Sequence, residues 1–208
     1  MNFVSISIGA CILFAMLGSA EAQDRMPPIP KDKMTEAQKK AADELIAGPR
    51  GQLTGPFNPL LRSPEFMTRL QKTGEYLRFN SSLDKKLIEF VILITARQWT
   101  QQYEWNAHAP LGLKAGLEPE VIAAIADGRR PAKMSTDEEI SYDLLMELHQ
   151  NRSVSDATYA RAVTRFGEQG VIDMVGLMGY YSTLGMVMNV ARTPLEAGTP
   201  QPLATFPH

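Results

Sequence analysis

The polypeptide is organised around the stretch TQQYEWNAH, residues 100–108, which follows an apolar run that contains one carboxylate, Glu89. If this stretch is helical, Glu104 and His108 lie on the same face, because helical residues four positions apart are neighbours. A carboxylate and an imidazole so placed are either a reactive pair or an exposed pair worth a few tenths of a kcal/mol. Local spacing alone leaves both interpretations open.

Composition sets the broad class of the protein. The chain has 208 residues, of which 44% are hydrophobic and 21% charged, as is typical of a globular protein with one good core. The formal net charge is -2, so there is no basic excess to attract nucleic acid or anionic lipid. We therefore expect neither of these as a partner.

The first segment is apolar and uncharged from Phe3 to Ala20 and ends in small residues before residue 23. This pattern predicts a signal peptide cleaved after Ala22, and hence a periplasmic or secreted protein with no membrane segment in its mature form. No Lys or Arg precedes the apolar run, so a retained N-terminal membrane anchor is the alternative. Cleavage would remove Cys11, the sole cysteine, and with it any disulfide or thiolate nucleophile.

Helical signals continue along the chain and predict an all-α fold. Caps are expected at Thr35, Ser63, Ser81 or Ser82, Ser135 and Ser155. The predicted helices span residues 35–47, 63–78, 82–98, 101–114, 118–127, 135–151, 155–166 and 170–190. Residues 90–95 are rich in β-branched side chains and also fit a buried strand, and Pro110 should kink its helix.

The chain divides into four parts at these signals. We expect a signal peptide at 1–22, an N-terminal arm and helix at 23–62, a helical domain at 63–192 and an extended proline-rich tail at 193–208. The last helix is long enough to cross a bilayer, yet polar residues such as Asp173 interrupt it. A buried core helix or a subunit interface is therefore the preferred interpretation.

Glu89 lies in the apolar run of the predicted 82–98 helix. Burial would raise its pKa and suit it to general acid work, whereas a solvent-facing Glu89 would simply lie one turn from Lys85. Together with Glu104 and His108 it lacks a recognised metal-ligand spacing, so we expect no metal.

The sequence around Glu89, Glu104 and His108 resembles that of the carboxymuconolactone decarboxylase family, which shares its fold with the alkylhydroperoxidase AhpD. The resemblance rests on GPFNPLL at 55–61, on Glu89 in the run ending in TAR at 95–97, on YEWNAH at 103–108 and on AGL at 115–117. It implies an AhpD-like helical bundle built around an antiparallel helical hairpin. It also implies a homo-oligomer, a trimer or hexamer.

The peroxidase branch of the family carries a Cys-x-x-Cys pair that would fall here on Gln101 and Glu104. Neither side chain can attack a peroxide or resolve the product, so we expect no thiol peroxidase activity. The resemblance instead leaves an acid and base set of Glu89, Glu104 and His108. In it His108 is the electrophile or proton donor, Glu104 the proton shuttle or orienting group, and Glu89 a buried partner of the histidine.

The function implied is a cofactor-free decarboxylase, or a related lyase or isomerase, that acts on a small carboxylated lactone or keto acid. Substrate contacts are expected from Gln101, Tyr103, Trp105 and Tyr181, although aromatic residues at such spacing also fit a core. The competing interpretation is a non-catalytic oligomer that binds a small molecule.

Overall fold

The structure, a computed structural model, describes residues 23–205 and is all-α, as predicted. The predicted signal peptide and its cleavage after Ala22 lie outside the described residues. The helices are α1 (Glu36–Ala47), α2 (Phe57–Leu60), α3 (Pro64–Glu75), α4 (Lys85–Gln98), α5 (Gln102–Lys114), α6 (Pro119–Ala126), α7 (Thr136–Asn151) and α8 (Asp156–Ala191). A short 3-10 helix, η1 (Lys31–Lys33), precedes α1, and a π-helical segment, η2 (Tyr76–Asn80), extends α3.

An antiparallel hairpin of α4 and α5 forms the centre of the fold, as expected for an AhpD-like bundle. A short turn joins the two helices; Thr100 has a φ of 47°, and the Gln101 N–H donates to the Ala96 carbonyl at 2.8 Å. The run from Leu87 to Arg97 is buried without interruption, so α4 is a helix enclosed on all sides and the strand alternative is wrong. Helix α5 continues through Pro110, the residue expected to kink it or to reset its first turns.

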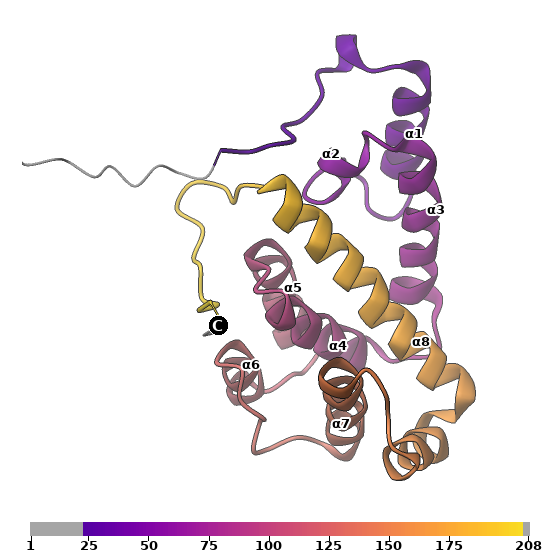
Figure 1. The fold of residues 1–208 in the computed structure, drawn as a ribbon, viewed down its shortest axis with the longest axis vertical. Helices are drawn as coiled ribbons and strands as arrows, with labels where there is room; N and C mark the ends of the chain where they lie inside the picture. The colour runs from indigo at the N-terminus through magenta and orange to yellow at the C-terminus, as the bar shows by residue number, and fades with distance from the viewer. Residues whose placement is uncertain (1–22, 206–208) are drawn as a thin grey trace, which may run out of the picture.

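Helix α8 crosses the whole molecule, with α1 to α3 on one side and α4 to α7 on the other (Figure 1). The two helices predicted at 155–166 and 170–190 form this one element, and the separation between them survives as a break at Gly167, whose φ is 69° and ψ 170°. By length and composition α8 is the one described helix that could cross a membrane. Half of its most apolar window is buried inside the molecule, as in the core helix of a globular protein.

Side-chain caps begin several helices where the sequence predicts them. Thr35 and Ser135 each form a capping box, and Ser155 accepts from the Thr158 N–H at 3.4 Å. The prediction of Ser81 or Ser82 as the cap of α4 is wrong. The cap is Asp84, whose carboxylate accepts from the Leu87 N–H at 2.9 Å.

Ser82 instead binds a buried acid on the opposite helix. Its backbone N–H and its hydroxyl donate to Asp173 Oδ2 at 3.0 and 2.9 Å, and the Tyr76 hydroxyl donates to Oδ1 at 3.1 Å. These bonds compensate the buried carboxylate of α8, because a buried charge is tolerated only with such partners. Ser82 therefore bonds to Asp173, a residue far along the chain, and does not cap α4.

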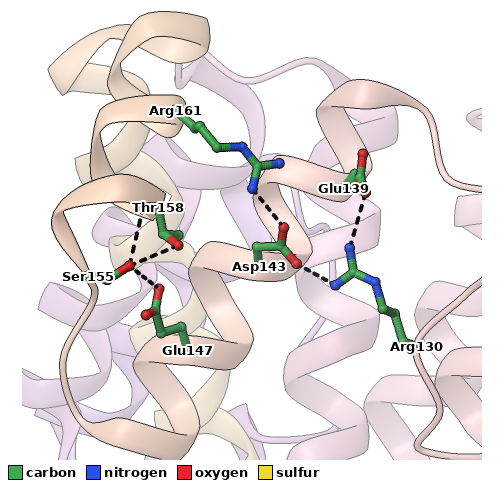
Figure 2. Close-up of polar contacts among 7 residues, drawn as sticks. All are labelled: Arg130, Glu139, Asp143, Glu147, Ser155, Thr158 and Arg161. Carbon is green, nitrogen blue, oxygen red and sulfur yellow. Dashed lines mark hydrogen bonds and ion pairs between the residues drawn. The ribbon is translucent and has the colours of Figure 1, made fainter.

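A polar cluster fastens α7 to the start of α8 (Figure 2). The Asp143 carboxylate on α7 accepts from Arg130, in the preceding loop, and from Arg161 on α8 at 3.1 Å. Ser155 donates to Glu147 at 3.3 Å on the same side. Because the arginines are about half exposed, these contacts align the two helices more than they stabilise them.

The two terminal segments pack onto the hairpin and α8. In the N-terminal arm, the Arg25 N–H donates to the Ala191 carbonyl at 2.8 Å. In the tail, Leu203 is buried, and its backbone exchanges two hydrogen bonds with the Gln102 side chain on α5. Residues 193–205 contain no helix, and they lie over part of α5 of their own chain.

Candidate active site

Glu89 and His108 face each other across the α4–α5 hairpin. His108 Nδ1 donates to Glu89 Oε2 at 2.6 Å. Both side chains are buried, with 10% and 4% of their surfaces exposed, respectively. Glu89 is thus the inward partner of the histidine and does not lie in solvent beside Lys85.

Glu104 lies on the other side of the imidazole ring. Its Oε2 is 3.5 Å from His108 Nε2, longer than an ordinary hydrogen bond, and its Oε1 is buried with no hydrogen-bond partner among the described residues. Burial raises the pKa of Glu104 above its usual value, although the charges of His108, Arg50 and Arg78 act in the opposite direction. This carboxyl group is therefore biased toward its neutral, proton-carrying form.

A cavity of about 300 Å³ opens beside Glu104 and His108. Helix α5 supplies one wall, α8 supplies Tyr181 and Leu184, and the loop between α1 and α2 closes the remaining side. The loop approaches α5 closely at Gly55, where φ is 55° and a Cβ would lie 2.4 Å from the Tyr103 ring. Only glycine fits both the conformation and the space, so the sequence GPF at 55–57 shapes this wall.

Two tyrosines of α8 stand behind the cavity. The Tyr181 ring meets His108 edge to face at 5.1 Å, and its hydroxyl is buried with no hydrogen-bond partner among the described residues. Burial raises the pKa of Tyr180 to about 12 and also raises that of Tyr181. Both phenols therefore stay protonated, and Tyr181 has a free donor beside the imidazole.

A glutamate, a histidine and a second glutamate on a helical hairpin are the features on which the sequence resemblance rests. Residues 64–138 match the carboxymuconolactone decarboxylase family. The segment contains the whole hairpin, and the resemblance is confirmed over it. Comparison with curated proteins and with solved structures finds no significant match to this chain.

The carboxymuconolactone decarboxylase segment does not build the site alone. It supplies Glu89, Glu104 and His108, whereas Tyr181 and Leu184 come from α8, after the matched residues, and Arg50 and Phe57 come before them. The flanking parts of this chain therefore complete the cavity that the family segment begins.

The four residues expected to contact substrate lie in different places. Tyr103 and Tyr181 line the cavity beside Glu104, but Gln101 and Trp105 do not. Gln101 caps α5 through the Tyr103 N–H and donates to Asn189 at 2.8 Å, and Trp105 is 3% exposed in the core. Gln101 thus holds the start of α5 and Trp105 packs in the core, and neither side chain faces this cavity.

Sequence reasoning missed two arginines in the cavity wall, Arg50 and Arg78. Arg50 follows the end of α1 in GPRG at 48–51, and Arg78 lies in η2 beside Phe79. Arg50 lies just after the end of a helix and Arg78 lies in the last turn of a helical segment, and neither belongs to a pattern that indicates a binding site. The nearest signal is GPFNPLL at 55–61, which entered the sequence resemblance but contains neither arginine and lies before the matched segment.

Within residues 23–205 no group of three or more His, Cys, Asp or Glu side chains is arranged to hold a metal ion. The chemistry available to the cavity from the described side chains is proton transfer through Glu104 and His108, donation of a hydrogen bond by Tyr181, and attraction of an anion by Arg50 and Arg78.

Proposed function

We propose that this protein is a cofactor-free acid/base enzyme, a decarboxylase or a related lyase or isomerase, acting on a small carboxylated lactone or keto acid. The observation that carries the proposal is the buried, unpartnered Glu104 Oε1 in the cavity wall beside His108. A buried polar atom without a partner is costly, and it is most easily explained by a ligand that completes it.

The geometry supports a division of labour in proton transfer. When a carboxylate placed β to a carbonyl group leaves as carbon dioxide, the electron pair of the broken C–C bond forms an enolate, which must be stabilised and protonated. Glu104, biased toward its acid form, can donate the proton to carbon, and the Tyr181 hydroxyl can donate a hydrogen bond to the enolate oxygen.

His108 connects Glu104 to the second acid. Its Nδ1–H is held by Glu89, so Nε2 is directed toward Glu104 and can exchange a proton with it. The 3.5 Å separation is long for direct transfer, but catalytic hydrogen bonds often shorten only when substrate is bound. Glu89 acts in this scheme as a positioning residue, because it does not line the cavity.

The first test is to replace the two groups that face the cavity. We expect Glu104→Gln and His108→Gln to lower turnover of lactone or keto-acid substrates by at least about 100-fold, the usual contribution of a positioned acid or base. Turnover is followed by release of carbon dioxide or by loss of the substrate signal in NMR spectra. His149→Gln, on α7 and away from this cavity, is the matched control and should retain full activity.

Binding measured in parallel separates the two classes of function. If both variants bind ligand as the wild type does but only turnover is lost, the enzyme proposal stands. If neither replacement alters any activity found by screening, the acid/base proposal fails. A non-catalytic small-molecule-binding protein would then be the better description.

We also propose export, from the signal-like sequence that ends at Ala22. N-terminal sequencing of the protein purified from its native host would show Gln23 as the first residue. An intact N-terminus would favour a retained anchor.

A further inference from the structure

The cavity beside Glu104 contains more positive charge than the proposed proton transfer requires. Its charged lining residues are Arg50, Arg78 and Glu104, together with the titratable His108. A guanidinium group is protonated at any physiological pH, whereas burial favours the neutral form of Glu104. Two cations therefore face this cavity with at most one partly ionised carboxylate between them.

Neither arginine has its charge compensated elsewhere. Among the described residues, neither forms a salt bridge; Arg50 donates to the Tyr180 hydroxyl at 2.7 Å and lies 4.8 Å from the centre of the Phe57 ring. Its Nε is buried and has no hydrogen-bond partner. Arg78 contacts the Phe79 ring at 5.2 Å. Aromatic faces hold a guanidinium in place and leave its N–H groups available.

Three buried polar atoms around the cavity lack partners: Arg50 Nε, Glu104 Oε1 and the Tyr181 hydroxyl oxygen. Buried donors and acceptors are almost always paired in native proteins. Three exceptions around one cavity indicate a place prepared for a polar ligand. The excess of guanidinium groups indicates that the ligand is an anion, and a planar carboxylate matches their fork of donors.

We propose that Arg50 and Arg78 form a carboxylate-binding subsite that anchors an anionic group of the ligand while its reacting carbon lies beside Glu104 and His108. The inference rests on the proposed function for the position of the reacting group, but the binding of the anion is a separate property. It assigns to Arg50, which lies before the family segment, a role in choosing carboxylated over neutral ligands.

The test compares two probes that differ only in charge. Levulinate is a small keto acid, and levulinamide is its neutral amide. We expect wild-type protein to bind levulinate at least tenfold more tightly than levulinamide by NMR titration, because hydrogen bonds to a charged group are stronger than neutral ones. Raising the salt concentration should weaken the binding of levulinate alone.

Two variants test the residues named. Arg50→Gln and Arg78→Gln should each weaken levulinate binding about 10- to 100-fold and leave levulinamide binding nearly unchanged. Arg69→Gln on α3 is the matched control, because Arg69 is exposed, paired with Glu65 and remote from the cavity lining. The Arg78 side chain forms no hydrogen bond with the described residues, so Arg78→Gln leaves the bond between Arg50 and Tyr180 in place.

The results separate this inference from the function on which it rests. Loss of levulinate binding in both arginine variants supports the subsite, even if no turnover that depends on His108 is ever found. Unchanged binding in folded Arg50→Gln and Arg78→Gln proteins overturns it, even if Glu104 and His108 prove catalytic. Absence of levulinate binding by wild-type protein at millimolar concentration also overturns it.

Discussion

Two opposing effects act on the pKa of the buried Glu104. Loss of solvation raises its pKa, and electrostatic interactions with His108, Arg50 and Arg78 oppose that rise without cancelling it. An acid held in this balance keeps its proton above the ordinary pKa of a glutamate, and its pKa responds to changes in the local charge. An anion bound near Arg50 and Arg78 would partly cancel their effect and favour the protonated carboxyl further.

The raised pKa of Glu104 predicts a pH-dependent stability. Above its ordinary pKa of 4.5 the unfolded chain has released this proton while the folded protein still holds it. The contribution to the free energy of unfolding therefore falls as pH rises from the ordinary to the folded pKa, by at most about 1.4 kcal/mol per pH unit. Urea denaturation across this window should show the decline in wild-type protein and its absence in Glu104→Gln.

A matched variant makes this measurement specific. Glu118→Gln removes an exposed carboxylate at the start of α6, so its stability curve should parallel that of the wild type. Parallel curves for wild type and Glu104→Gln would instead show that Glu104 is ionised in the folded protein. The proton-donor role would then have to pass to His108.

The start of α4 supplies polar groups both to its own cap and to the neighbouring helix α8. The first turn of α4 is capped by Asp84, while Ser82, two residues earlier, serves Asp173 of α8. Asp84 thus caps its own helix, while the buried Asp173 takes its hydrogen bonds from Ser82 in the segment before α4. Glu104 Oε1 and the Tyr181 hydroxyl, in contrast, have no partner among the described residues, and both residues line the cavity beside His108.

Replacing Asp84 should destabilise the hairpin through the loss of this cap. Asp84→Ala should lower the free energy of unfolding by about 1 kcal/mol, because the Leu87 N–H loses its acceptor. Lys85→Ala, at the exposed next position, should change it by no more than about 0.5 kcal/mol. Chemical denaturation of the two variants compares these effects, and equal losses would refute the assignment of the cap.

At the scale of the whole molecule, α8 leaves an apolar stripe uncovered. Ile172 is 68% exposed and Val190 is 58% exposed, and Val175 and Met186 lie between them with 37% and 41% exposed. Large exposed apolar residues at helical spacing along one element are typical of an interaction surface. We propose that this stripe lies at the interface of the homo-oligomer implied by the family resemblance.

Light scattering tests the assembly directly. The purified protein should have a mass three or six times that of its monomer, which is 23.0 kDa for the full 208-residue chain, and the combined Ile172→Glu and Val190→Glu changes should shift it toward the monomer. Lys72→Glu, an exposed change on α3, should leave the mass unaltered. A monomeric wild-type protein would contradict the proposal.

The sequence by itself determined the all-α class, most helix boundaries and the members of the acid and base set. These follow from short-range rules: apolar periodicity, caps such as Thr35 and Ser135, and the spacing of Glu104 and His108 along one helix. A family resemblance added Glu89 to the set. Each of these signals lies within a few turns of one helix or within one hairpin.

Only the tertiary structure decided which groups meet in the cavity. Arg50, Arg78 and Tyr181 come from three segments that the sequence separates widely, and nothing in their local patterns links them. Tertiary packing also removed Gln101 and Trp105 from the cavity wall and paired Ser82 with Asp173. The physical reason is that charge compensation and burial depend on contacts through space, which no local periodicity encodes.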